Sequence, residues 1–347
     1  MVKVSILMAV YNTAEYLPQC LDSLLDQTMG DFQVICVDDA STDDSLKVLE
    51  SYAHGDSRIE VISLAENHGQ AFARNQGLMR AQGTYTCFLD SDDWLGKDAL
   101  QQIVSAFEQD ETIDSVLFRC RYYYSEDRIE EYPMPAFEKK EKKDKEAAAS
   151  VDGQPVALSG EQAFELSLTW KIHGVYAVKT SIHLQYPYDD SSRSYSDDNT
   201  TRLHYLASRK VVSCGGAYFY RQHAASVTHQ ISSRRFDYLK ANVSMMEQLR
   251  RLKVSSHLLN VYENERWKNV KFLRKLGWAL ILLFICTLAT IVIGNYEASQ
   301  VLQLNGCEFS YTFAFSDATL ILGFISLLVA EVFAIGLKMK EEQDLTI

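Results

Sequence analysis

Residues 4–89 alternate between short apolar runs and segments whose apolar residues recur at helical spacing, and this alternation limits the folds open to the chain. The sequence predicts strands and helices in alternation, over 4–10, 13–27, 32–37, 43–52, 59–64, 69–81 and 85–89. Strands that alternate with helices at this spacing are joined by right-handed crossovers and form a largely parallel sheet, covered on both faces. We therefore expect an α/β fold whose ligands bind beyond the carboxyl ends of the strands.

Acidic residues follow two of these strands at the points where they end. Asp38 and Asp39 close the second strand, and the stretch DSDD follows the fourth. Because parallel strands end at one edge of the sheet, we expect both groups to lie there. Carboxylates packed together repel unless a cation or a proton intervenes, so Asp90 and Asp92 predict a site for Mn²⁺ or Mg²⁺. Asp93 is interpreted as a turn or capping residue.

Four motifs follow one another in this region, and they read SILMAVYN, VDDASTD, ENHGQAFARNQGLMRAQG and FLDSDD. In this order and at this spacing, over about residues 3–110, they resemble the successive motifs of family-2 inverting glycosyltransferases of the GT-A fold. Each motif alone is a weak signal, but four in series are a strong one. The resemblance implies a Rossmann-like GT-A catalytic domain with a mostly parallel sheet. The chain departs from the family at Ala9, where proline is common, and at Ala40, where glycine is common.

The resemblance also implies roles for single residues. A nucleotide-sugar donor, expected to be a UDP-sugar, would be bound by Ala9, Tyr11, Asp39, Asn67, Arg74, Asp90, Ser91 and Arg221. Asp92 would bind the divalent ion that bridges the diphosphate, with Asp90 and His223 as further metal contacts. Arginine supplies a fixed fork of donors for phosphate oxygens, and the ion offsets charge on the departing diphosphate. Purely structural roles are the alternatives: a surface ion pair for Arg74, a turn for Asn67 and an ordinary hydrogen bond for His223.

The second half of this region carries the candidate general base. The segments TWKIHGVYAVKTSI and SYSDDNTTRLHYLAS resemble the acceptor half of the family, in which an acidic pair opens a helix. Inversion at the anomeric carbon needs a carboxylate opposite the leaving group to take the proton of the acceptor. By resemblance Asp198 is the candidate base and Asp197 is the alternative, while Asp197 also fits a helix N-cap. The lysine-rich segment 138–153 is interpreted as an exposed charged loop.

Two apolar runs near the carboxyl terminus are long enough to cross a bilayer. Residues 276–293 form a run of 18 without a charge, and residues 318–337 form a run of 20 with one charge, Glu331. They predict a hairpin of two transmembrane helices over 276–294 and 318–337, with two buried core helices as the alternative. Lys and Arg flank both outer ends, whereas 295–317 contains neither, so we expect both ends to face the cytoplasm.

The segment before the first apolar run is basic. Residues 250–275 contain eight Lys or Arg and two Glu, which suits a helix on an anionic membrane surface, with a solvated helical face as the alternative. The predicted organisation is a GT-A domain over 1–232, with a nucleotide-sugar half (1–110) and an acceptor half (111–232), a basic juxtamembrane helical region (233–275), the hairpin and a cytoplasmic tail (338–347).

The composition narrows the function further. A net charge of −12 argues against a nucleic-acid partner, and seven cysteines without a C-x-x-C pair predict reduced thiols. The sequence therefore predicts a metal-dependent inverting glycosyltransferase, of the hexosyltransferase type, anchored in the cytoplasmic membrane. It would transfer a sugar to a hydroxyl of a lipid-linked or surface-polysaccharide glycan at the cytoplasmic face. Transfer to polyprenyl phosphate, which needs no base, and a non-catalytic nucleotide-sugar-binding scaffold are the alternatives.

Overall fold

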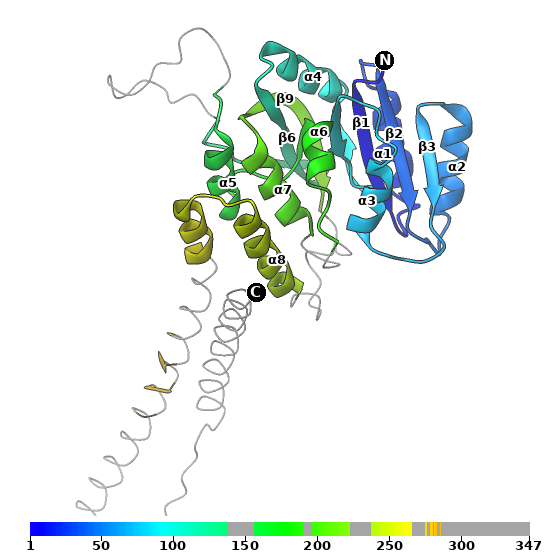
Figure 1. Cartoon of the computed structure of the whole chain (residues 1–347). Helices are drawn as coiled ribbons and strands as arrows, with labels where there is room; N and C mark the ends of the chain where they lie inside the picture. The colour runs from blue at the N-terminus through cyan, green and yellow to red at the C-terminus, as the bar shows by residue number, and fades with distance from the viewer. Residues whose placement is uncertain are drawn as a thin grey trace, which may run out of the picture. The chain divides into compact units, whose positions relative to one another are not determined.

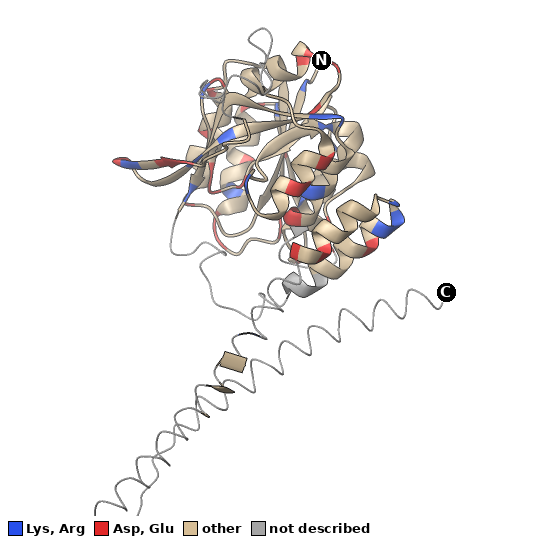
Figure 2. Cartoon of the chain, turned by 90° about the vertical axis from the view of Figure 1, so that its left-hand side faces the viewer, with Lys and Arg blue, Asp and Glu red and all other residues tan. Residues whose placement is uncertain are grey.

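The computed structural model describes residues 1–137, 156–190, 196–222 and 237–265, together with a few single residues between 275 and 285. The chain divides into two compact units, Met1–Leu258 and Leu259–Ile347. The first unit is a sheet covered by helices (Figure 1). Acidic and basic residues are interspersed along the ribbon of this unit (Figure 2).

Within the described residues, nine strands form one sheet. They are β1 (Val4–Val10), β2 (Phe32–Asp38), β3 (Ile59–Ser63), β4 (Tyr85–Phe88), β5 (Trp94–Leu95), β6 (Ile113–Ser125), β7 (Arg128–Glu131), β8 (Tyr176–Lys179) and β9 (Lys210–Arg221). Their order is β3-β2-β1-β4-β8-β6-β9-β5, and β7 pairs with β6 beside this path.

The helices lie on both faces of the sheet, as predicted. They are α1 (Leu17–Leu25), α2 (Ser45–Gly55), α3 (Gln70–Leu78), α4 (Ala99–Gln109), α5 (Gly160–Leu168), α6 (Thr180–Gln185), α7 (Ser196–Ala207) and α8 (Asp237–Arg251). Local periodicity therefore predicted the first four strands and first three helices to within a few residues. In Figure 1, α5, α7 and α8 lie side by side, and residues of α7 contact both of its neighbours.

The sheet is mixed, so the predicted mostly parallel sheet is wrong for its second half. The strands β1 to β4 are parallel to one another. In contrast, β8 runs antiparallel to both β4 and β6, and β5 is antiparallel to β9. The pattern of apolar residues shows that a strand exists, but its direction depends on a connection and a partner far away in the sequence.

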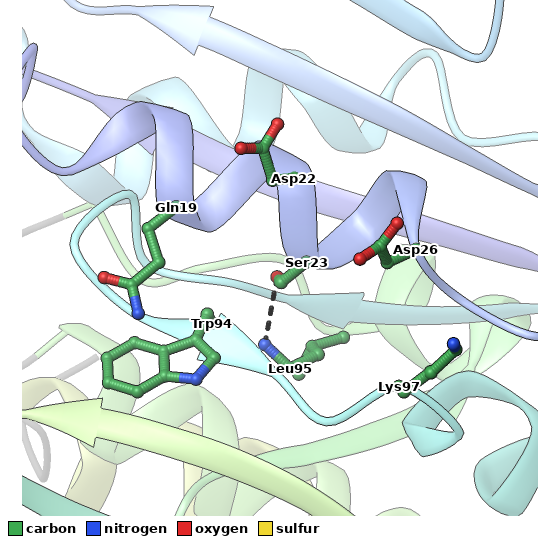
Figure 3. Close-up of a pocket in the computed structure, with 7 residues that line it drawn as sticks. All are labelled: Gln19, Asp22, Ser23, Asp26, Trp94, Leu95 and Lys97. Carbon is green, nitrogen blue, oxygen red and sulfur yellow. Dashed lines mark hydrogen bonds between the residues drawn. The ribbon is translucent and has the colours of Figure 1, made fainter. Parts of the chain in front are cut away.

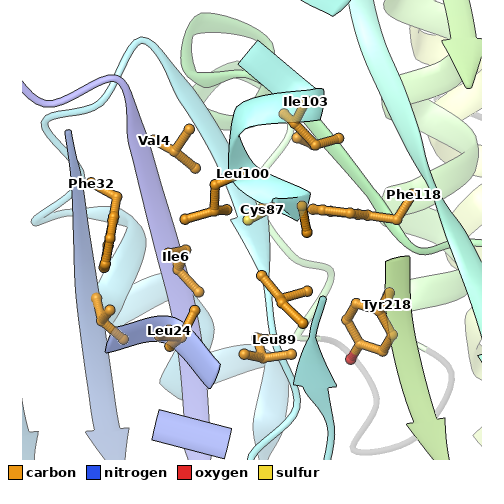
Figure 4. Close-up of a cluster of buried hydrophobic side chains, with 14 of the residues drawn as sticks. Val4, Ile6, Leu24, Phe32, Cys87, Leu89, Leu100, Ile103, Phe118 and Tyr218 are labelled. Atoms are coloured by element: carbon orange, nitrogen blue, oxygen red, sulfur yellow. The ribbon is translucent and has the colours of Figure 1, made fainter. Parts of the chain in front are cut away.

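The alternation of side chains along β1 builds the core on both faces of the sheet. Ile6 and Met8 belong to a cluster with residues of α1 and α4, whereas Leu7 packs with residues of α3. Figure 4 shows Ile6 beside Leu24 of α1 and near Leu100 of α4. A third cluster joins β6 and β8 to α5 and α7. These clusters hold the strand ends, and the loops that follow them, in fixed positions.

The predicted membrane segments are not part of this description. Among the residues that the structure describes, no helix has both the length and the apolar character needed to span a membrane. The predicted spans 276–294, apart from single residues, and 318–337 lie outside the described residues, as does the charged segment 138–153.

Candidate active site

The loops that follow β1 and β2 are joined to each other. Asn12 accepts a hydrogen bond from the N–H of Thr42 at 2.7 Å, and its own N–H donates to Ser41 Oγ at 3.0 Å. Ala40, in the second loop, has a φ of 59°, a left-handed conformation that favours glycine. The family preference for glycine at this position thus has a backbone cause. Tyr11, predicted to contact the nucleotide, is 48% exposed beside this junction.

Asp39 joins the end of β2 to the start of α3. Its carboxylate is buried and accepts the N–H groups of His68 and Gly69, each at 2.8 Å. The side chain of Asn67 donates to the Asp39 carbonyl oxygen at 3.1 Å. The structure therefore brings Asp39 and Asn67 together and shows that both stabilise the loop that leads into α3, while their predicted contacts with a nucleotide stay a prediction. Each carboxylate oxygen has a second lone pair, which can accept a donor from a ligand.

Arg74, on α3, is the centre of the site. Its side chain is 1% exposed, and its Nη2 donates to Oδ1 of Asp90, which also accepts Gln70 Nε2 at 3.0 Å. The guanidinium lies 4.2 Å from the ring centroid of Phe88 and 5.2 Å from that of Tyr188. Within the described part of the chain, Arg74 Nε has no hydrogen-bond partner. A buried guanidinium with an N–H that has no partner among the described residues suits a nearby anionic ligand.

Four charged groups influence one another at this point. Burial raises the pKa of Asp90, and the charges of Asp92 and Asp197 raise it further, while Arg74 acts in the opposite direction. Burial acts to lower the pKa of Arg74, but the charges of Asp90 and Asp197 outweigh it and the pKa rises. The carboxylates come from the turn after β4 and from α7, over a hundred residues apart in the chain. Asp90, Asp92 and Asp197 therefore interact electrostatically, whereas the predicted meeting of the acids after β2 with those after β4 stays a prediction.

The two candidate bases take different positions on α7. Asp198 pairs with Arg202, one helical turn further on, at 3.5 Å, and its N–H donates to Asp197 Oδ1 at 3.1 Å. Successive residues of a helix point about 100° apart, so the two carboxylates cannot face the same way. Asp197 acts electrostatically on Arg74, whereas Asp198 lies toward Arg202. Which of the two is the base stays a prediction.

The predicted metal site can be tested against its donor atoms. Among the described residues, no group of three or more His, Cys, Asp or Glu is arranged to hold a metal ion. His223 lies outside these residues. Asp90 and Asp92 supply hard oxygen donors, and their mutual repulsion favours a cation between them. These residues fit Mg²⁺ or Mn²⁺ held jointly with substrate phosphates, which need few protein ligands.

Asp93 has a larger role than the predicted turn or cap. It does lie in a turn, since its N–H donates to Asp90 O at 3.0 Å. Its carboxyl group, however, is 1% exposed and accepts Tyr218 Oη at 2.7 Å and the N–H of Arg221 at 2.8 Å. Burial raises its pKa well above the usual range, as do the charges of Asp90 and Asp92. Asp93 therefore joins the acidic turn, residues 90–93, to β9.

Ser91 and Arg221 also hold the acidic turn in place. Ser91 is buried, and its Oγ accepts Thr13 Oγ1 at 2.9 Å. Arg221 Nε donates to the Asp92 carbonyl oxygen at 2.8 Å, and its Nη2 donates to Gln19. The structure thus places the predicted nucleotide ligands Ser91 and Arg221 beside the turn, where they position its backbone.

A separate pocket of about 460 Å³ lies between α1 and β5. Its lining consists of Gln19, Asp22, Ser23, Asp26, Trp94, Leu95 and Lys97. Figure 3 shows Gln19 and Trp94 at one end and Asp26 and Lys97 at the other. The guanidinium of Arg221 lies 4.7 Å from the ring centroid of Trp94, which lines this pocket. Because Arg221 also bonds the Asp92 carbonyl oxygen, it connects the pocket to the acidic turn.

Sequence reasoning missed Gln70, Tyr188 and Tyr218. Gln70 was open to detection, because it lies one turn before Arg74 on the same face of α3. Tyr188 is held by Asn75, whose side chain bonds both its N–H and its carbonyl oxygen at 2.9 Å. This contact joins residues 113 positions apart, so no local sequence pattern predicts it.

The fold and the family comparison define the class of this part of the chain. Residues 5–160 match the sequence model of the family "Glycosyl transferase family 2". The match contains the predicted motifs, and the described fold is GT-A-like with a mixed sheet. Residues 5–160 therefore match a glycosyltransferase family 2 domain, which supports a glycosyltransferase of this family. Residues 252–347 match a second family, described as "Protein of unknown function (DUF2975)".

Curated relatives are similar to the chain over part of its length. It is 45% identical over 101 residues to a putative glycosyltransferase, EpsH, and 38% identical over 135 residues to the uncharacterized glycosyltransferase EpsJ, both of Bacillus subtilis. It is 45% identical over 101 residues to the poly(ribitol-phosphate) beta-glucosyltransferase of Bacillus spizizenii. These matches span 29%, 39% and 28% of this chain and 29%, 38% and 16% of the relatives.

Solved structures share the fold. TarS of S. aureus in complex with UDP-GlcNAc superposes with a TM-score of 0.62 at 20% identity, covering 77% of this chain and 73% of that one. A mannosyltransferase of Pyrobaculum calidifontis, in complex with GDP-Man and Mn²⁺, gives a TM-score of 0.53 at 15% identity, covering 94% and 87%. At these identities the likeness concerns the fold alone.

Proposed function

We propose that the chain transfers a sugar from a UDP-sugar to a hydroxyl group of a glycan, with inversion at the anomeric carbon. The observation that carries this proposal is the cluster of Arg74, Asp90, Asp92 and Asp197 at the carboxyl ends of the strands. The family match of residues 5–160 supports the class of reaction. The structural neighbour with bound UDP-GlcNAc and the relative that glucosylates poly(ribitol phosphate) support the donor and the acceptor class.

In this proposal the diphosphate of the donor binds against Arg74. The guanidinium is fixed by Asp90 and by two aromatic rings, so it is a preorganised positive charge beside the phosphates. Preorganised donors of this kind stabilise negative charge as it develops on a leaving group. The loops held by Asn12 and Asp39 would receive the nucleoside, because they form the neighbouring part of the same sheet edge.

Mn²⁺ or Mg²⁺ belongs to the proposal. Asp92 and Asp90 would hold the ion together with the phosphates, and a bound ion would neutralise charge on the departing diphosphate. The protein residues would position the phosphates.

A carboxylate of α7 would take the proton of the acceptor hydroxyl. Asp198→Asn should lower turnover by about 10²–10⁴-fold, the usual worth of a general base. Asp197→Asn is the matched control, and the larger loss identifies the base. If both variants keep nearly full turnover, the acceptor is an already ionised group such as polyprenyl phosphate.

We further propose that the apolar runs 276–294 and 318–337 anchor the chain in the cytoplasmic membrane, with the glycosyltransferase domain on the cytoplasmic side. Their length and the distribution of Lys and Arg around them support this topology. Such an anchor would raise the effective concentration of a lipid-linked acceptor at the site.

The test is release of UDP by the purified full-length chain from a panel of UDP-sugars, with membrane extract as the acceptor and Mn²⁺ or Mg²⁺ present. We expect acceptor-dependent release from at least one donor, and loss of release in Asp92→Ala. Equal release by wild type and Asp92→Ala, or none from any donor, would refute the proposal.

A further inference from the structure

Trp170 is an exposed aromatic residue in a strained backbone conformation. It follows α5, where its N–H donates to Ser167 O at 3.3 Å and the N–H of Lys171 donates to Leu166 O at 3.0 Å. This pair of hydrogen bonds is the Schellman motif, which usually has glycine at the position that Trp170 occupies. Trp170 has a φ of 53°, in the left-handed region that any residue with a Cβ atom adopts with strain.

The surrounding structure holds Trp170 in this conformation. Tyr132 Oη donates to the Trp170 carbonyl oxygen. A Cβ atom on Gly174 would lie 3.7 Å from Cζ3 of Trp170, so the ring packs close to that backbone. Even so, 43% of Trp170 stays exposed. Strained residues cluster where ligands bind, and this one carries a large, partly exposed aromatic side chain.

The Trp170 ring borders the face of α7 that carries the candidate base. Its centroid lies 5.4 Å from the guanidinium carbon of Arg202. Arg202 is 2% exposed and donates to Asp198 at 3.5 Å. Residues 198 and 202 are one turn apart and therefore share a face of the helix. One buried arginine thus connects the exposed ring to the carboxylate.

We propose that Trp170 is the stacking platform for the acceptor sugar, an inference that rests on the proposed function. A pyranose ring of the acceptor glycan lies against the indole and presents a hydroxyl group to the carboxylates of α7. The indole offers a large flat apolar surface with little rotamer entropy to lose, because its backbone is already fixed. The donor contacts at Arg74 do not involve this ring.

The test compares wild type with Trp170→Gly and Trp170→Phe in the full-length chain, with methyl glycosides of glucose, galactose and N-acetylglucosamine as acceptor probes. Glycine removes the ring and suits the backbone, so Trp170→Gly should unfold at the same or a higher temperature than wild type. We expect the KM for the acceptor to rise about tenfold, which corresponds to about 1.4 kcal/mol of lost binding. The KM for the donor and the acceptor-independent hydrolysis of the donor should stay within about twofold, and Trp170→Phe should be intermediate.

An unchanged acceptor KM in Trp170→Gly would overturn the proposal, and so would a joint loss of thermal stability, donor binding and turnover, which marks a packing role. Titration of the methyl glycosides against tryptophan fluorescence gives a second measurement that does not need turnover. A saturable change in wild type that Trp170→Gly lacks supports the platform. If wild type releases no UDP from any donor, the proposed function fails, and the fluorescence titration alone decides the platform: no change in wild type overturns it.

Discussion

Replacing Arg74 with methionine should destabilise the chain strongly, although methionine fills much of the same space. Arg74 is 1% exposed, and its partner Asp90 is 25% exposed beside the charges of Asp92 and Asp197. Removal of the arginine leaves these carboxylates without their buried cation, which typically costs about 3–5 kcal/mol. At about 2–4 °C per kcal/mol for a domain of this size, the midpoint of thermal unfolding should fall by about 6–20 °C.

The assay is a double-mutant cycle in the full-length chain, followed by circular dichroism on heating. Arg74→Met and Asp90→Asn are measured singly and together. Because the double variant buries neither charge alone, it should lose less stability than the sum of the two single losses. Arg128→Met is the matched control, since Arg128 pairs with Glu130 on the surface, where side-chain exposures of 61% and 50% predict less than about 1 kcal/mol.

The reasoning is refuted if Arg74→Met lowers the unfolding temperature no more than Arg128→Met does. It is also refuted if the two single losses in the cycle simply add, since the ion pair with Asp90 would then contribute nothing of its own.

Three further predictions concern the backbone, pH and the metal. Ala40→Gly should stabilise the chain by about 1 kcal/mol in thermal unfolding, because Ala40 has a φ of 59°, whereas the control Ala9→Gly, within β1, should destabilise it by about 0.5–1 kcal/mol; a fall in stability for Ala40→Gly would contradict the assigned conformation. Burial lowers the pKa of His173 and of His204 to about 4 each, so the unfolded chain binds more protons between pH 6.5 and 4. Each histidine should therefore lose about 2 kcal/mol of stabilisation between pH 7.5 and 5, and His204→Gln should show a smaller pH dependence than wild type; equal dependence would refute this. Chelation by EDTA should abolish UDP release and added Mn²⁺ or Mg²⁺ should restore it, whereas full activity in EDTA would remove the ion from the account.

The part of the fold that the sequence predicted is the part that depends on local spacing. The β-α alternation through β4 follows from apolar residues a few positions apart, and the structure keeps it. The antiparallel directions of β8 and β5 depend on partners that lie tens of residues to more than a hundred residues away. Periodicity cannot supply them, so the second half of the sheet was predicted wrongly.

The candidate site divides in the same way. Asp39 and Asp90 closely follow strands of the parallel half, so their positions at the strand ends could be predicted. Tyr218, which donates to Asp93 across 125 positions, and the half-exposed Trp170 could not, because nothing near them in the sequence marks their role. The left-handed backbone conformation of Trp170 at the end of α5 is known only from the structure.

The most direct test of the central claim, that the loops after β1 and β2 and the start of α3 bind a nucleoside diphosphate sugar, is photolabelling with 5-azido-UDP-glucose followed by peptide mapping. The account predicts adducts within residues 9–12, 38–42 or 67–70, reduced by excess UDP-glucose. Adducts confined to other peptides, or labelling that UDP-glucose does not compete away, would contradict it.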